Sequence, residues 1–145
     1  MPTETTEKKF RIPLQVAYAD TDQMGFVHHS NYVKYMEHAR WEAFRKTGLA
    51  YKEIEARGII MPVISMNMQY LKPIVYDELV TIDVGFSMVR PAALEVDYLI
   101  FNENNTLVHR ASTRLAFLKK STKSPCVMPD FIKEKIAPKL LKNTR

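Results

Sequence analysis

Apolar and polar residues alternate along most of this chain. Apolar side chains occupy every second position from Phe10 to Tyr18, which predicts a half-buried strand. Pro13 lacks an amide donor, so we expect this first strand near an edge of its sheet. The same period returns in four later segments, and each is predicted to be a strand: 64–70, 82–88, 94–100 and 107–118.

One long segment has a helical period instead. Between Asn31 and Thr47, one apolar stripe follows the spacing of an α-helix. The stripe consists of Tyr32, Met36, Ala39 and Ala43. Ser30 or Asn31 is expected to cap the beginning of this helix, because a short polar side chain can accept a backbone N–H bond there. Gly48 suits the left-handed residue that follows the last turn.

The order of these elements is one strand, one long helix and then four strands. A single helix cannot cover two sheets, but it can cover one face of a curved antiparallel sheet. We therefore predict an α+β fold of about five strands wrapped around one helix, as a single domain over residues 1–145. Residues 1–7 are expected to be an N-terminal arm. Residues 121–145 are a C-terminal extension, with a short helix at 130–136 capped by Asp130.

Composition narrows the class of protein. The 145 residues are enough to bury a core without disulfides or metals. The single cysteine, Cys126, excludes an intramolecular disulfide and a cysteine-based zinc site. Residues 1–9 have no apolar run typical of a secretory signal, and the longest apolar stretch, Ile59–Ile64, is far shorter than the roughly 20 residues of a membrane span. A cytoplasmic protein without a membrane span is expected.

The chain is basic, with 21 Lys and Arg residues against 16 Asp and Glu residues. Such a charge suits nucleic acid, a membrane surface or an acidic small ligand. The cations are spread along the sequence, and no aromatic–basic motif of a nucleic-acid-binding module is present. We therefore expect no nucleic-acid partner, and most of these charges are expected to be solvated.

Potential chemistry is concentrated in residues 18–32, between the first strand and the long helix. This segment holds two carboxylates, two imidazoles and a phenol. A helix N-terminus offers unpaired N–H groups that stabilise an anion, and a nearby carboxylate can act as a nucleophile or a general base. The pattern alone leaves other interpretations open. Asp20 and Asp22 can cap turns, the histidines can be surface residues, and the four side chains can contribute to a metal site.

The same segment resembles a known family. The pattern Tyr18-x-x-x-Asp22-x-x-Gly25 is followed by His29-x-Asn31-Tyr32 and then by Glu37-x-Ala39-Arg40. It is similar to the 4-hydroxybenzoyl-CoA thioesterase family of hotdog-fold acyl-CoA thioesterases, and most similar to the subgroup of Tol–Pal-associated thioesterases. The resemblance extends over most of residues 8–120, and it implies a hotdog fold.

The resemblance also implies roles for the matching positions. Asp22 corresponds to the catalytic carboxylate, and Tyr18 and His29 match two further positions of the site. The backbone N–H near His29 is implied as the oxyanion donor. Gly25 would allow the loop to approach the thioester closely, and Asn31 is expected to contact substrate.

Two further positions in the segment carry no catalytic assignment: Asp20 matches the family pattern, and His28 departs from it. Asp20 lies within the motif but not at its catalytic position. His28 stands where the subgroup more often has tyrosine, which leaves the acyl preference open.

The implied reaction is hydrolysis of short-chain, medium-chain or aromatic acyl-CoA, with Asp22 either activating water or attacking the carbonyl. Family members use no metal or prosthetic group.

The implied substrate also predicts partners. CoA phosphates require cations, and Arg90, Arg114 and Lys119-Lys120 are the candidates. Residues 61–66 and Phe86 are candidates to line an acyl pocket, and core packing is the alternative for each apolar side chain. The resemblance implies a homodimer or homotetramer whose sheets join edge to edge. A thioesterase for acyl carrier protein and a non-catalytic acyl-CoA-binding hotdog protein are the alternatives.

Overall fold

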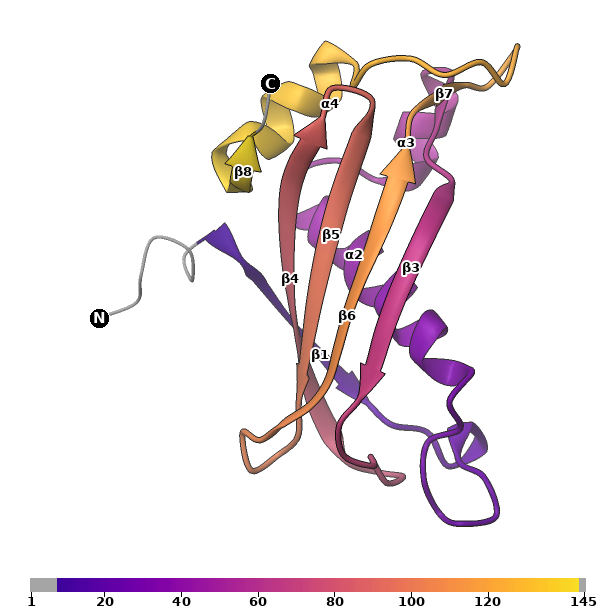
Figure 1. Cartoon of the computed structure of the whole chain (residues 1–145), viewed down its shortest axis with the longest axis vertical. Coiled ribbons are helices and arrows are strands. Elements are labelled where there is room, and N and C mark those ends of the chain that lie inside the picture. Colours follow the sequence, from indigo (N-terminus) through magenta and orange to yellow (C-terminus); the bar gives the residue numbers. More distant parts are fainter. Residues whose placement is uncertain (1–7, 144–145) are drawn as a thin grey trace.

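The computed structural model describes residues 8–143 (Figure 1), so the predicted arm at 1–7 lies outside the described residues. Its main elements, in chain order, are β1 (Phe10–Gln15), α2 (Asn31–Lys46), α3 (Tyr51–Ala56), β2 (Ile59–Ile60), β3 (Val63–Tyr70), β4 (Leu79–Arg90), β5 (Ala93–Phe101), β6 (Leu107–Ala116), β7 (Leu118–Lys119), α4 (Asp130–Ile136) and β8 (Leu140–Asn143). None of the helices in this range is long and apolar enough to cross a membrane.

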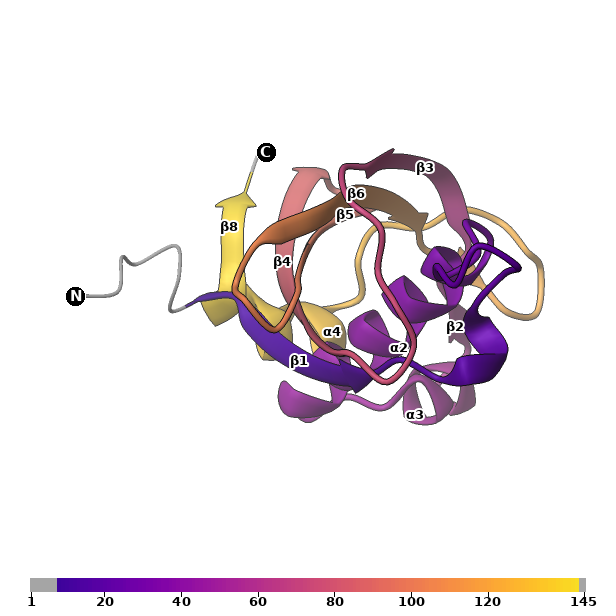
Figure 2. The same ribbon diagram turned by 90° about the horizontal axis from the view of Figure 1, so that it is seen from below.

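The main sheet follows the order β1-β4-β5-β6-β3, and each of these neighbours is antiparallel. The sheet curves around α2, which lies on its concave face (Figure 2). The five predicted strands and the single long helix are therefore confirmed. β1 is an edge strand, and the prediction from Pro13 is correct.

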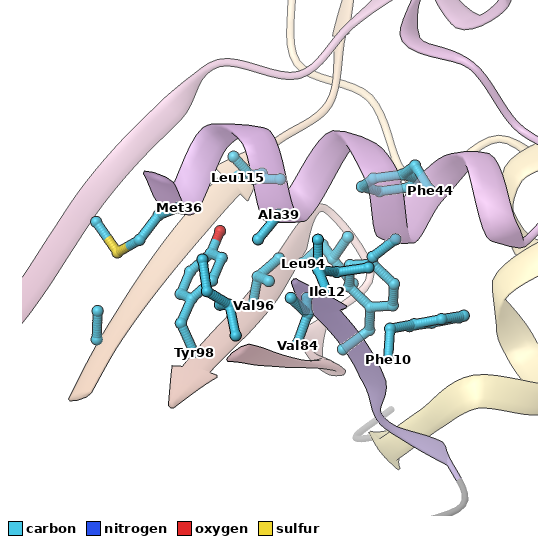
Figure 3. Close-up of a cluster of buried hydrophobic side chains, with 14 of the residues drawn as sticks. Phe10, Ile12, Met36, Ala39, Phe44, Val84, Leu94, Val96, Tyr98 and Leu115 are labelled. Atoms are coloured by element: carbon cyan, nitrogen blue, oxygen red, sulfur yellow. The ribbon is translucent and has the colours of Figure 1, made fainter. Parts of the chain in front are cut away.

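The hydrophobic core lies between α2 and the concave face of the sheet (Figure 3). The predicted helical stripe is buried, and Phe44, directly after Ala43, is buried with it. Phe44 is fully buried, and its ring centroid lies 4.9 Å from that of Phe86 on β4. Phe86 therefore belongs to the core, and its predicted place in an acyl pocket is wrong.

Strand β3 differs from the prediction of one buried apolar face per strand. Seven of its eight residues are exposed, including Val63, Ile64 and Met66. Of the main-sheet strands, it pairs only with β6. The strand thus leaves both an apolar surface and a row of backbone groups without a covering element among the described residues.

The C-terminal segment, predicted as an extension, packs against the main sheet and contributes to the hydrophobic core. Helix α4 forms at the predicted residues, but Pro129 and not Asp130 holds the N-cap position. Strand β8 then pairs in parallel with β4, and Ile132, Ile136 and Leu140 join the core. A Cβ atom added to Gly85 on β4 would lie 2.6 Å from the Cδ1 atom of Leu141. Glycine at position 85 therefore gives the C-terminal strand room to approach the sheet.

The contact between α2 and β4 generates a stability prediction. We expect Phe44→Ala to lower the free energy of unfolding by about 3–5 kcal/mol, because it removes a buried ring and leaves a cavity between helix and sheet. Urea denaturation measures this change. His38→Ala, on the exposed side of the same helix, is the control and should change stability by less than about 0.5 kcal/mol. Equal effects of the two substitutions would contradict the assignment of Phe44 to the core.

Candidate active site

The loop before α2 is held by Asp20, which lies in one turn of 3₁₀ helix (Tyr18–Asp20). Its buried carboxylate accepts hydrogen bonds from the Lys34 ammonium at 2.6 Å and from the Tyr35 hydroxyl at 2.8 Å. The hydrogen bond from Lys34 is the main reason that the pKa of Asp20 is lowered, against the opposing effect of burial. Asp20 is therefore a charged anchor between the loop and α2.

The backbone of Asp20 strengthens the same connection. Its carbonyl oxygen accepts the His28 N–H at 2.9 Å and the Asn31 side-chain amide at 2.8 Å. Asn31 thus fixes the loop to the first turn of the helix, and its predicted contact with substrate stays a prediction. The predicted side-chain cap at Ser30 or Asn31 is wrong. Ser30 already has helical dihedral angles and makes no side-chain cap bond; its hydroxyl lies 2.8 Å from Nδ1 of His28.

Asp22 closes a tight loop with one of its carboxylate oxygens. Oδ1 accepts the Met24 N–H at 2.8 Å and the Phe26 N–H at 3.3 Å. No hydrogen bond to Oδ2 is recorded within residues 8–143. Gly25 has a φ of +82°, which favours glycine, and a Cβ there would meet no atom within 4 Å. The backbone conformation therefore favours glycine at position 25, and its predicted close approach to substrate stays a prediction.

Asp22 and His29 line one pocket of about 310 Å³ beside the N-terminus of α2. The pocket is formed by the loop before the helix, the first helical turn, the end of β3 and the segment after it. Its lining residues are Asp22, Met24, Phe26, Val27, His29, Tyr32, Tyr70, Leu71, Lys72 and Pro73. It brings a carboxylate, an imidazole and the positive end of a helix together on an apolar wall.

The other predicted site residues lie elsewhere. Tyr18 does not line the pocket; its side chain is 75% exposed and its ring lies edge-on to Tyr76, 5.2 Å between centroids. Arg90 ends β4, in the turn at the opposite end of the sheet from the loop that carries Asp22 (Figure 1). Arg114 forms an ion pair with Glu95 at 3.4 Å. On β6 it is paired with Ser65 of β3, which lies about 16 Å along β3 from Tyr70, a residue that lines the Asp22 pocket. The three residues therefore do not join Asp22 within one protomer.

Two residues at this site were not predicted: Tyr70, which lines the pocket, and His109, which lies behind it. Tyr70 donates its hydroxyl to the His29 carbonyl at 2.9 Å, which ties the end of β3 to the helix N-terminus. His109 on β6 is fully buried, stacks on Tyr32 at 4.3 Å and meets Tyr70 edge-on at 4.8 Å. Alternation along the last strand contained a signal for His109. Position 109 lies on the same face of the strand as Ala111 and Leu115, which are apolar, whereas Arg110 lies on the other face.

Burial shifts the pKa values of this aromatic cluster. It lowers the pKa of His109 to about 4, and neither of its ring nitrogens has a hydrogen-bond partner within the described residues. It also raises the pKa of Tyr32 to about 12, with a further contribution from Tyr70. His109 is therefore a neutral imidazole at pH 7. Across residues 8–143, no group of three or more His, Cys, Asp and Glu side chains is arranged to hold a metal ion.

A curved antiparallel sheet around one long helix, with a carboxylate at the helix N-terminus, defines the hotdog class of thioester hydrolases. The comparisons with known proteins agree. Residues 16–136 match the family described as the thioesterase-like superfamily, and the chain belongs to this family. The predicted hotdog fold and thioester hydrolase class are thus confirmed.

Individual relatives support this membership. The acyl-CoA thioester hydrolase YbgC of Escherichia coli O157:H7 is 30% identical over 123 residues, which cover 85% of this chain and 92% of that protein. Among solved structures, the DHNA-CoA thioesterase of Staphylococcus aureus has a TM-score of 0.83 and 31% identity, with 90% of this chain and 87% of that chain covered. The hypothetical protein TT1821 of Thermus thermophilus has a TM-score of 0.84 and 30% identity, with 92% and 99% covered.

The buried imidazole generates a pH prediction. The pKa of His109 is lower in the folded chain than its ordinary value of 6.5, so the unfolded chain binds more protons between these values. Stability is therefore retained above pH 6.5 and lost as the pH falls towards 4, by about 3 kcal/mol in total. We expect His109→Leu to remove this loss of stability between pH 6.5 and pH 4. Urea denaturation at pH 7 and pH 4 measures the free energy of unfolding of both proteins. Identical pH dependence of the two proteins would show that His109 is not buried as a neutral group.

Proposed function

We propose that this chain hydrolyses acyl-CoA thioesters at the pocket that Asp22 and His29 line. The observation that carries this proposal is the position of Asp22. One carboxylate oxygen is fixed by two backbone N–H groups, and the residue lies in a pocket beside the N-terminus of α2. The fixed oxygen holds the carboxylate in place, and the other oxygen is left to act on a bound carbonyl or water.

The helix N-terminus supplies the second part of the mechanism. In the turn that enters α2, the N–H groups of His28, Ser30 and Asn31 are engaged in local hydrogen bonds. No such bond is recorded for the N–H of His29 within the described residues. This N–H and the partial positive charge of the helix terminus would stabilise the oxyanion that forms when the thioester carbonyl is attacked.

Two routes agree with this geometry. In the first, Asp22 removes a proton from water, the water oxygen bonds to the carbonyl carbon, the C–S bond breaks and the CoA thiolate receives the proton. In the second, Asp22 attacks the carbonyl and expels the thiolate; water then hydrolyses the resulting mixed anhydride. The His29 side chain lines the same pocket in either route and would orient water or substrate.

The pocket also indicates a substrate size. A volume of about 310 Å³ is at the lower end of the range for small-molecule sites, so a short or aromatic acyl group fits it better than a long chain. Its aromatic walls, Tyr32 and Tyr70, favour the same choice. Lys72 is the one cationic side chain among the lining residues, and it would meet a CoA phosphate at the pocket mouth. CoA as the preferred carrier is consistent with the name of the relative YbgC.

A second copy of the chain would complete the molecule at β3. Ile64 is 48% exposed, and Val63 and Met66 are exposed beside it on a strand whose outer edge is unpaired within the described residues. An apolar edge strand of this length is a site for strand pairing. We therefore propose a homodimer in which two β3 strands pair. The homotetramer, the cytoplasmic location and the specific subgroup named above stay predictions.

The role of Asp22 generates the central test. We expect Asp22→Asn to lower kcat/KM for butyryl-CoA or benzoyl-CoA by about 10²–10⁴-fold, because the amide cannot act as a base or a nucleophile. Release of free thiol measures the rate, and circular dichroism checks the fold. Asp130→Asn, an exposed carboxylate on α4, is the matched control and should keep the wild-type rate.

Two outcomes would contradict the proposal. Wild-type turnover by Asp22→Asn would remove Asp22 from the mechanism. Absence of hydrolysis by the wild-type chain with every acyl-CoA tried would favour the non-catalytic alternative. Parallel assays with the same acyl group on acyl carrier protein identify the preferred carrier.

Light scattering after size-exclusion chromatography tests the dimer. The wild-type chain should have twice the protomer mass of 16.8 kDa. We expect Ile64→Glu to give the monomer mass, because two facing carboxylates would be placed at a desolvated edge. Val127→Glu, which adds the same charge to an exposed loop, should leave the mass unchanged. A wild-type monomer, or an unaffected Ile64→Glu dimer, would contradict pairing at β3.

A further inference from the structure

A second pocket, of about 300 Å³, lies farther along α2 and is separate from the one that contains Asp22. Residues from α2, α3 and the segment that leads into β3 form it. Arg40 lines this pocket although only 6% of the residue is exposed. Eight residues separate Tyr32, which lines the first pocket, from Arg40, a distance of about 12 Å along the helix. The two pockets therefore contact different parts of the same helix.

Two tyrosines fix the guanidinium of Arg40. Its Nε donates to the Tyr51 hydroxyl at 2.9 Å, and its Nη1 donates to the Tyr98 hydroxyl at 3.0 Å. Tyr98 in turn lies 2.9 Å from the hydroxyl of Thr113 on β6. Burial acts to lower the pKa of Arg40, but the two tyrosines more than offset it and the pKa is raised. The group is therefore a rigid, permanent cation.

This cation lacks a paired anion. Within residues 8–143, no carboxylate oxygen lies within 4.0 Å of the Arg40 guanidinium. Buried charges are almost always paired, because removing an unpaired charge from water costs free energy. The two tyrosine hydroxyls solvate the Arg40 cation but do not neutralise it. A guanidinium also has five N–H donors arranged to hold a carboxylate, and the tyrosines occupy two of them.

The walls of the pocket indicate what such an anion would carry. Trp41, Ile54, Ile60 and Met61 line it, so the rest of a ligand would lie against apolar surface. Glu37 and Glu55 also line the pocket, and because both are exposed, solvent weakens their repulsion of an anion without abolishing it. We propose that the Arg40 pocket binds a free monocarboxylate with a short apolar body. If the proposed hydrolysis holds, the released acids have this chemistry, and the pocket would bind the product class.

Trp41 makes the proposal directly testable, because it is the single tryptophan of the chain and it lines this pocket. Titration of the full chain with hexanoate should give a saturable change in tryptophan fluorescence. Hexan-1-ol, which keeps the apolar body and loses the charge, should bind at least 10-fold more weakly. Equal affinities for the two compounds, or no saturable response to hexanoate, would overturn the proposal.

Two variants locate the ligand. Arg40→Met should reduce the affinity for hexanoate to that for hexan-1-ol. Glu37→Gln, an exposed substitution that leaves the fold intact, should tighten hexanoate binding about 2-fold or more by removing repulsion, with no effect on hexan-1-ol. This second variant keeps the test valid if Arg40→Met fails to fold. Unchanged hexanoate affinity in Glu37→Gln would count against the proposal.

Asp22→Asn separates this proposal from the proposed function. It should abolish hydrolysis and leave hexanoate binding at Trp41 unchanged. Loss of the fluorescence response in Asp22→Asn would place the ligand in the other pocket and overturn the assignment to Arg40. Because the titration needs no turnover, a failure of thioester hydrolysis would leave its result intact.

Discussion

The geometry of the candidate site depends on one buried carboxylate, that of Asp20. Its side chain binds Lys34 and Tyr35 on α2, while its backbone carbonyl accepts hydrogen bonds from His28 and Asn31. Three of these bonds connect the loop to α2, and the fourth, from His28, closes the loop on itself. Asp22, two residues later, is thereby held beside the helix N-terminus, although it makes none of these bonds itself. Asp20, to which no catalytic role is assigned, thus positions Asp22, the proposed catalytic carboxylate.

Aromatic rings provide the rigid surroundings of this loop. Tyr70 fixes the end of β3 to the His29 carbonyl, and His109 stacks behind Tyr32. At mid-helix, Tyr51 and Tyr98 similarly hold Arg40. Helix α2 is therefore connected to the sheet by polar contacts at two levels as well as by its apolar stripe. Such contacts fix the rotation and the axial position of the helix, which hydrophobic burial alone specifies less strictly.

Periodicity was sufficient for the fold and insufficient for the details of the site. The strands and the helix follow from local alternation and spacing, and the motif around Asp22 predicted the carboxylate and His29 in one pocket. Ser30 failed as a cap because His28 is close enough to engage its hydroxyl, a contact that spacing does not reveal. Arg90 and Arg114 lie far from Asp22 along the strands, a distance that strand register sets and periodicity does not reveal, and their predicted contact with CoA phosphates stays a prediction. The exposure of β3 was likewise outside the reach of pattern analysis, since a strand's own alternation does not say how far the helix extends over it.

The two outer edges of the main sheet are unequal. The β1 edge is six residues long, contains Pro13 and carries Arg11 in an ion pair with Asp83, whereas the β3 edge is eight residues long, contains neither proline nor a charged residue, and exposes Val63, Ile64 and Met66. Proline and charge discourage further strand addition. A sheet that continued from one protomer into another through β3 would thus end on both sides at β1 and at β8, which pairs with β4 beyond the end of β1. Strand addition would then stop at two protomers. The difference between the two edges would therefore favour a dimer and disfavour open-ended polymerisation.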